Sequence, residues 1–112
     1  MSDNVLVIFG VTSAGARFRP SDWVERFCGV MAPYTSKYQS SGNVQNYQGV
    51  MGYSDLVFPA THDGDRVVMA FYRLNDIEPL AWEFVLNFAK ENDLKTEQVD
   101  QSKILTTYII PN

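Results

Sequence analysis

The chain is short of the residues on which several kinds of protein depend. Its 112 residues include one cysteine and one histidine, which excludes an intramolecular disulfide framework and a cysteine-based zinc cage. The longest apolar run covers residues 5–11, whereas a membrane-spanning helix needs about 20 apolar residues. The first four residues carry no cation, so we expect no secretory signal, no membrane association and a cytoplasmic location.

Cations are scarce as well. Nine Lys and Arg residues stand against thirteen Asp and Glu residues, for a net charge of −4, and the nine form no basic run. Nucleic-acid affinity comes largely from cations that neutralise phosphates, so we expect no nucleic-acid partner. The hydrophobic fraction of 46% is ordinary for a globular protein, and the length predicts a single domain over residues 1–112.

Two strand-like segments are apolar on both alternating sets of residues. They are residues 4–12 and 67–72, and this pattern is typical of central strands that are covered on both faces. Between residues 55–61 and 66–73, the Asp63-Gly64 pair predicts a hairpin turn. Pro59 lacks an N–H and therefore predicts that the first strand of this hairpin is an edge strand or a bulged strand.

One helix is predicted to begin after Pro20. Asp22 and Glu25 have the spacing of a capping box, with Ser21 as the alternative cap, and Pro33 ends the helix. Its buried stripe is predicted to contain Val24, Phe27, Cys28 and Met31.

A second helix is predicted to begin near Asp76, with Pro79 in its first turn. Helical spacing predicts a buried stripe, while Trp82, Leu86 and Ala89 fall outside it. The predicted stripe is Ile77, Leu80, Ala81, Phe84, Val85 and Phe88. Residues 94–99 and 104–109 are predicted to be strands, with a break between them.

This order of elements predicts an α+β fold, the ferredoxin-like β-α-β-β-α-β plait. Right-handed crossovers would place both helices on one face of an antiparallel sheet. The opposite face would then be apolar and larger than the patches that monomers usually expose. We expect a partner, the loop of residues 34–49 or the C-terminal segment to cover it, and a two-fold homodimer is the most economical cover.

Arginines flank the start of the first predicted helix. Arg17, Arg19 and Arg26 lie near Ser21 in the sequence. Cations beside a helix N-terminus can hold a carboxylate or a phosphate, which makes these four residues a candidate site for a small anionic ligand. In the alternative interpretation, Asp22 caps the helix and pairs with an arginine, so that the charges are structural.

A second candidate surface is aromatic. The loop of residues 34–49 is long for a compact domain, and such loops either pack and move or contact a ligand or partner. With two phenylalanines of the central strands, it gives a candidate interaction surface. Its residues are Tyr34, Tyr38, Tyr47, Phe9 and Phe71.

The remaining chemistry is sparse. His62 beside the hairpin turn is either a general base or a solvated turn residue. Cys28 lies on the predicted buried stripe, where a free cysteine behaves as a small hydrophobe. The acidic residues show no metal-ligand spacing, and no glycine-rich loop precedes a Lys-Ser or Lys-Thr pair. We predict no catalytic residue, no metal and no cofactor.

Two stretches carry a family resemblance. Residues 19–31, Arg-Pro-Ser-Asp-Trp-Val-Glu-Arg-Phe-Cys-Gly-Val-Met, resemble the signature of a bacterial family of small uncharacterised proteins, a domain of unknown function. Residues 77–84 and 88–92 resemble the second helix of that family. The resemblance implies an intracellular bacterial protein and supplies no activity and no catalytic residue.

Three hypotheses follow. The first is a non-catalytic, self-associating module that binds a protein or a small molecule through the open sheet face and the tyrosine-bearing loop. The second is a small sensor or enzyme that binds an anionic metabolite through the arginines near the first helix. The third is an RNA-binding domain, which would use aromatics of the two central strands but lacks the basic surround.

Overall fold

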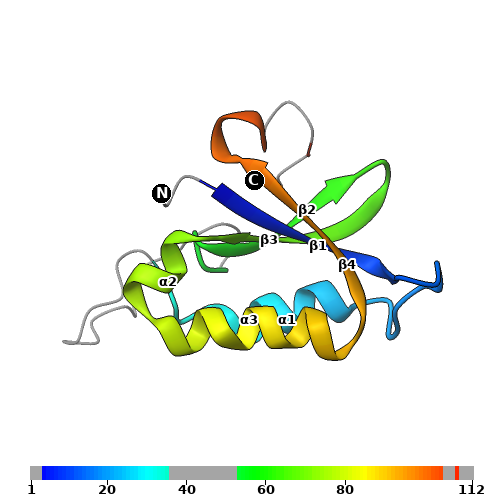
Figure 1. Cartoon of the computed structure of the whole chain (residues 1–112), viewed down its shortest axis with the longest axis horizontal. Coiled ribbons are helices and arrows are strands. Elements are labelled where there is room, and N and C mark those ends of the chain that lie inside the picture. Colours follow the sequence, from blue (N-terminus) through cyan, green and yellow to red (C-terminus); the bar gives the residue numbers. More distant parts are fainter. Residues whose placement is uncertain (1–3, 36–52, 105–107, 109–112) are drawn as a thin grey trace.

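The computed structural model describes residues 4–35, 53–104 and 108, and it shows a sheet with helices on one side (Figure 1). The fold is mixed α+β, as the sequence predicts. The elements in order are β1 (Asn4–Thr12), α1 (Trp23–Met31), β2 (Val57–His62), β3 (Asp65–Phe71), α2 (Arg73–Ile77), α3 (Pro79–Glu91), β4 (Leu94–Asp100) and the 3-10 turn η1 (Gln101–Lys103). None of the described helices is both long enough and apolar enough to cross a membrane.

The four strands pair antiparallel in the order β2-β3-β1-β4. The two segments predicted to be central, β1 and β3, are the inner strands, and β2, which contains Pro59, lies at an edge. The hairpin between β2 and β3 is confirmed. Asp63 and Gly64 have φ values of 51° and 84°, which are the two positive values that a type I′ turn requires.

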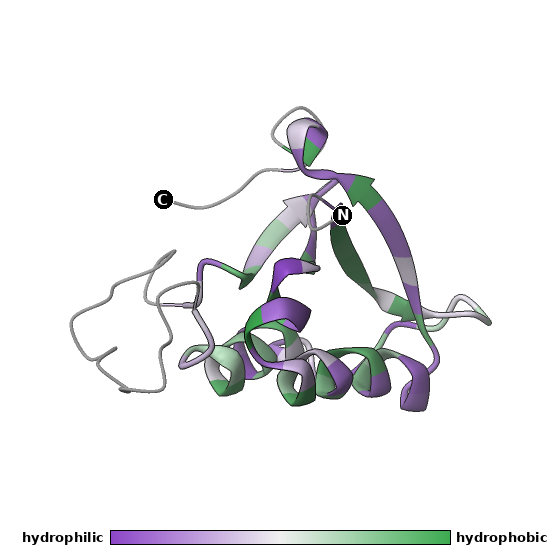
Figure 2. Cartoon of the chain, turned by 60° about the vertical axis from the view of Figure 1, so that its left-hand side comes forward, coloured by the Kyte–Doolittle hydropathy of each residue, from purple (hydrophilic) through white to green (hydrophobic). Residues whose placement is uncertain are grey.

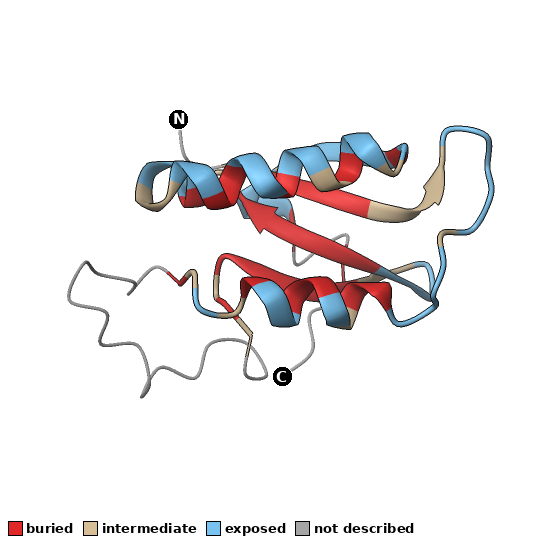
Figure 3. Cartoon of the chain, turned by 90° about the horizontal axis from the view of Figure 1, so that it is seen from below, coloured by how far each residue is buried: buried red, intermediate tan, exposed pale blue. Residues whose placement is uncertain are grey.

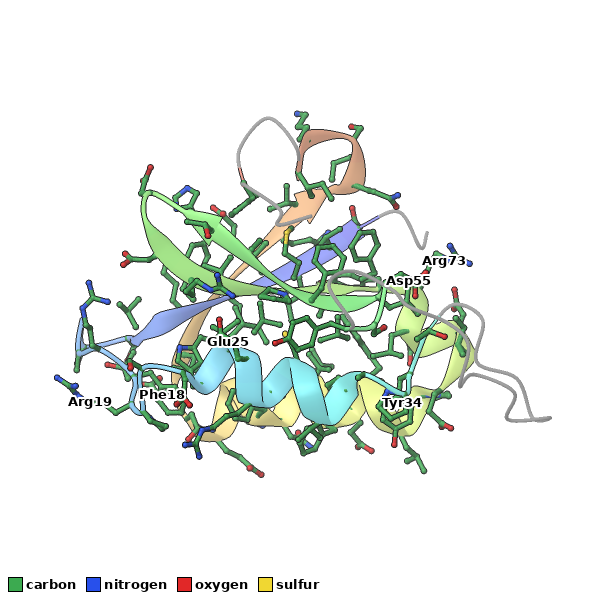
Figure 4. All side chains as sticks on the ribbon, turned by 180° about the vertical axis from the view of Figure 1, so that it is seen from behind. Phe18, Arg19, Glu25, Tyr34, Asp55 and Arg73 are labelled. Atoms are coloured by element: carbon green, nitrogen blue, oxygen red, sulfur yellow. The ribbon has the colours of Figure 1, made fainter. Side chains whose placement is uncertain are left out.

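Helix α1 buries the side chains that its spacing predicts, and Trp23 in addition. The predicted capping box is wrong. The Asp22 carboxylate accepts a 3.0 Å bond from Arg26 Nε, and Glu25 pairs with Arg66 of β3. In Figure 4 Glu25 lies on the side of α1 that faces the sheet. Both carboxylates therefore serve ion pairs, and no side chain caps the helix.

The predicted start of the second helix is also wrong. Residues from Arg73 are already helical, so Asp76 lies inside α2, whose N-cap position is Tyr72. Glu78 then takes an extended conformation, with φ −146° and ψ 88°, because the residue before a proline is hindered from the helical region. Pro79 begins α3, as predicted, and the chain changes direction between two helices instead of forming one.

The buried face of α3 agrees with the predicted stripe at Ala81 and Val85 and differs from it at Trp82 and Ala89, which were predicted to lie outside it. Ala81, Val85 and Ala89 recur every four residues and are buried together with Trp82, whose ring lies 4.8 Å from that of Tyr72. Small alanines let the helix approach the sheet closely. The larger side chains of the predicted stripe lie beside α1 instead, and Leu80 is 74% exposed. Figure 3, seen from the helix side, shows exposed residues along the outer surfaces of both helices.

On the sheet face without helices, Ile104 and Tyr108 pack against the strands. The η1 turn lies on that side in Figure 1, and beyond it Ile104 and Tyr108 are only 7% and 3% exposed. Tyr108 contacts both edge strands, through the His62 ring of β2 and the Glu97 carboxylate of β4. Two side chains of the C-terminal segment thus lie on the face for which the sequence predicts a cover, with a homodimer as the most economical one. Neither Ile104 nor Tyr108 is in a strand, so the strand predicted over residues 104–109 is wrong at both positions.

Candidate functional site: a cationic notch at one end of the sheet

A cavity lies where β1 changes its pairing partner. The ladder between β1 and β3 ends at the pair Phe9 and Val67. Beyond it, Val11 forms a bridge with Arg17, and Phe18 N–H donates to the Gly10 carbonyl at 2.9 Å. The cavity between the departing β1 and the β2–β3 turn has a volume of about 450 Å³. We call it the cationic notch.

The notch collects positive charge from three parts of the chain. Arg17 and Arg19 come from the loop before α1, Arg66 from β3 and Lys95 from β4. These are four of the nine Lys and Arg residues in the sequence. Two of the thirteen acidic residues, both in or beside the hairpin turn, also line the cavity; they are Asp63 and Asp65.

Three of the four cations contact a side chain of the same chain. The Arg17 guanidinium lies 3.4 Å from the Asp65 carboxylate, Arg66 pairs with Glu25, and Lys95 Nζ lies 5.0 Å from the centre of the Phe9 ring. The partners are exposed or partly exposed, so the pairs are weak, and each guanidinium keeps further N–H donors for a ligand.

Arg19 differs from the other three cations. Its side chain forms no ion pair with any residue in the described part of the chain. Figure 4 shows it projecting outward at the end of the molecule, beside Phe18. A ligand can therefore bind the Arg19 guanidinium without displacing a carboxylate from it.

Three of the four residues predicted to bind an anion line the notch: Arg17, Arg19 and Ser21. Arg26 does not. Its guanidinium pairs with Asp22 at 3.0 Å and lines a different cavity, between the helices. The predicted structural pairing of Asp22 with an arginine is therefore present, and Arg26 leaves the candidate set. Sequence reasoning missed Arg66 and Lys95 because strand pairing, which is long-range in sequence, brings them to the notch.

His62 forms one wall of the notch. Its ring packs edge-on against Phe9, at 5.7 Å, and lies 5.1 Å from the Tyr108 ring, while Nδ1 is 3.7 Å from the Asp63 carboxylate. It is the last residue of β2 and is partly buried, which differs from a freely solvated turn residue. In the described residues, no three His, Cys, Asp or Glu side chains gather as a metal site would require.

Cys28 is not among the residues that line the notch. It lies fully buried on α1, and burial raises the pKa of its thiol to about 12, with the charge of Glu25 adding to the effect and that of Arg66 opposing it. A nucleophilic cysteine must be a thiolate. Cys28 is therefore a core residue, as its place on the helical stripe predicts.

The predicted aromatic surface is not assembled by the described residues. Phe71 is 8% exposed and packs against the Phe58 ring at 5.8 Å. Phe9 is half-buried beneath Lys95. Tyr34 is half-buried at the far end of the helices, as Figure 4 shows, and Tyr38 and Tyr47 lie outside the described residues. A face that carries Ile104 and Tyr108 also leaves no bare platform for stacking bases.

Comparison with known proteins places this fold in a family. A solution structure described as the first structural representative of its family matches with a TM-score of 0.66 and 26% sequence identity, over 95% of this chain and 93% of that one. The curated proteins give no match. A family model described as "Protein of unknown function (DUF3579)" matches residues 2–99, which include the notch and both long helices. The chain therefore belongs to the DUF3579 family of proteins of unknown function.

Proposed function

We propose that the chain is a non-catalytic binding module whose cationic notch takes a small anionic ligand. The observation that carries the proposal is the gathering of four cations around one cavity in a chain with a net charge of −4. Asp63 and Asp65 also line the cavity, so four cations against two carboxylates leave an excess of two positive charges. Such an excess raises the local concentration of anions. Arginine also bonds both carboxylates and phosphates in a bidentate manner.

The walls of the notch favour a ligand with an apolar body. Phe9, Val11 and Phe18, which are all partly exposed, contribute apolar surface next to the cations. The volume of about 450 Å³ falls in the range of small-molecule pockets. A carboxylate or phosphate ester with a compact apolar body matches both the charge and the walls. The buried Cys28 thiol does not line the notch, and the described residues contain no cluster of three metal-ligating side chains.

The architecture is consistent with such a module. We infer that the fold is the ferredoxin-like plait, because antiparallel pairing in the order β2-β3-β1-β4 and the packing of α1 and α3 on one face support it. The short α2 is an addition before the second long helix. In this arrangement the notch lies at the end of the two central strands, where the covering helix α1 begins.

Binding can be tested by nuclear magnetic resonance on the 12.7 kDa chain. Titration with phosphate, phenyl phosphate and benzoate is expected to shift the amide signals of Gly10, Gly64 and Arg66, which line the notch. In Arg19→Ala and Lys95→Ala the affinity should fall about tenfold, which corresponds to roughly 1.4 kcal/mol for one charged hydrogen bond.

Arg73→Ala is the matched control, because Arg73 is an exposed arginine at the other end of the molecule (Figure 4). Its affinity should equal that of the wild type. The proposal fails if none of the three probes shifts the notch amides. It also fails if Arg19→Ala, Lys95→Ala and Arg73→Ala weaken binding equally, which would indicate diffuse attraction to the whole surface.

A further inference from the structure

An apolar groove runs along the outside of the two helices. Two cavities of about 390 and 260 Å³ lie between α1 and α3, and Val30 and Phe84 line both of them. We call the joined cavities the helix groove. Val30 is 61% exposed and Phe84 46%, and Figure 2 shows hydrophobic segments recurring along both helices.

The two ends of the groove differ in shape. At one end, the Trp23 and Phe88 rings stack at 5.9 Å, and the Phe27 ring lies 4.5 Å from that of Phe88. These rings wall a hollow next to the start of α1. At the other end, Leu80 projects into solvent with 74% of its surface exposed. Both ends are hollowed, but only the Leu80 end also carries an apolar side chain that projects far enough to enter the hollow walled by the rings.

The two ends also differ in charge. Arg26 lines the end with the hollow, and Glu78 lines the end with Leu80. Arg26 pairs with Asp22 in its own chain, but both side chains are more than half exposed, so that pair is weak. The guanidinium retains N–H donors that a second carboxylate can accept from.

A two-fold rotation matches these ends to each other. Leu80, Phe84 and Phe88 are four residues apart on α3, so each step advances roughly 6 Å along the helix axis. An axis at Phe84 that sets two copies of α3 antiparallel brings Leu80 of one copy opposite the Phe88 hollow of the other. The same rotation turns the Arg26 end of one copy toward the Glu78 end of the other.

We propose that the helix groove is the interface of a two-fold homodimer. An isologous interface requires one patch that is complementary to itself, and the groove meets this requirement in shape and in charge. The occupant is a second copy of this chain, because the groove carries both halves of each match. The interface adjoins the cationic notch, since Phe18 and Trp23 line both cavities, and it lies on the opposite side of the sheet from Ile104 and Tyr108.

Sedimentation velocity over a range of concentrations tests the apolar part of the proposal. The wild type should shift from monomer to dimer as its concentration rises, and Leu80→Glu should weaken dimerisation more than tenfold, because a carboxylate would be buried without a partner. Leu80 is exposed in the monomer, so circular dichroism should show an unchanged fold. Leu86→Glu is the control, because Leu86 is a 42% exposed leucine of the same helix that lines a separate cavity.

Reversing the charges of Glu78 and Arg26 tests whether the groove binds a second copy of this chain. Glu78→Arg alone and Arg26→Glu alone should each abolish self-association, since like charges then meet at both ends of the groove. An equimolar mixture of the two variants should associate again, because both contacts in the mixed dimer join opposite charges. The proposal is overturned by a wild type that stays monomeric, by equal effects of Leu80→Glu and Leu86→Glu, or by a mixture that associates no better than its components.

Discussion

The phenol oxygen of Tyr108 donates a 2.8 Å hydrogen bond to Glu97 Oε1 and so ties the C-terminal segment to the edge strand β4. The ring of the same tyrosine lies 5.1 Å from His62 on the opposite edge strand. Between these edges, Val7 and Met69 of the central strands have no exposed surface. The end of the chain therefore protects the apolar side of the sheet that the helices leave free.

Removing the Tyr108 side chain should destabilise the fold. We expect Tyr108→Ala to lower the free energy of unfolding by about 3 kcal/mol, the usual cost of deleting a buried aromatic ring. Tyr108→Phe should cost about 1 kcal/mol, because it removes one hydrogen bond while the exposed Glu97 regains water. Urea unfolding followed by circular dichroism measures both values. Equal losses in the two variants would show that packing of the ring contributes nothing.

Alkaline pH should weaken this contribution. Burial raises the pKa of Tyr108 from 10.0 to about 12, and the hydrogen bond and the charge of Glu97 act in the same direction. The folded state then keeps a proton that the unfolded state releases above about pH 10. By linkage, the contribution is complete below pH 10 and is lost as the pH rises toward 12.

The measurement is the difference in unfolding free energy between the wild type and Tyr108→Phe. This difference should stay constant from pH 7 to 9, then fall and reverse its sign between pH 10 and 12, because a pKa raised to about 12 favours the protonated side chain by more than the roughly 1 kcal/mol of one hydrogen bond. Every other titrating group is common to both proteins. A difference that persists unchanged to pH 12 would contradict the proposed origin of the raised pKa.

Much of the fold could be predicted from local patterns. The segments now seen as β1 and β3 are apolar on both alternating sets of residues, and this pattern alone indicates the two inner strands. The buried stripe of α1 and the turn at Asp63 and Gly64 follow from spacing and from backbone chemistry in the same way. These features depend on residues that are neighbours in the sequence.

The errors arise where distant segments compete for the same residue. On α3, apolar residues are so numerous that spacing does not separate the face toward the sheet from the face toward α1. Ala81 and Val85 lie on the face toward the sheet, and Leu80 is exposed. Likewise, the cations of the notch that precede α1 could be found in the sequence, whereas Lys95 joins them only through the pairing of β4 with β1.

Cys28 should not react with thiol reagents while the protein is folded. Its side chain is fully buried. The thiol pKa is raised to about 12, which leaves almost no reactive thiolate at pH 8. Labelling with Ellman's reagent should therefore be slow in buffer and become fast when urea unfolds the chain. Rapid labelling of native protein, with circular dichroism unchanged, would show that the thiol is accessible.

Alanine substitutions at two glycines should change the free energy of unfolding in opposite directions. A Cβ at Gly10 would lie 2.8 Å from Trp23 Nε1 and 3.4 Å from two carbons of the same indole, whereas a Cβ at Gly29 would meet nothing within 4 Å. Gly10→Ala should cost about 1–3 kcal/mol, because it overfills the contact between β1 and the start of α1. Gly29→Ala should add about 0.5–1 kcal/mol, since alanine loses less conformational entropy than glycine inside a helix. Urea midpoints measured at equal m-values test both signs, and a stabilising Gly10→Ala would mean that the indole does not rest on the backbone of β1.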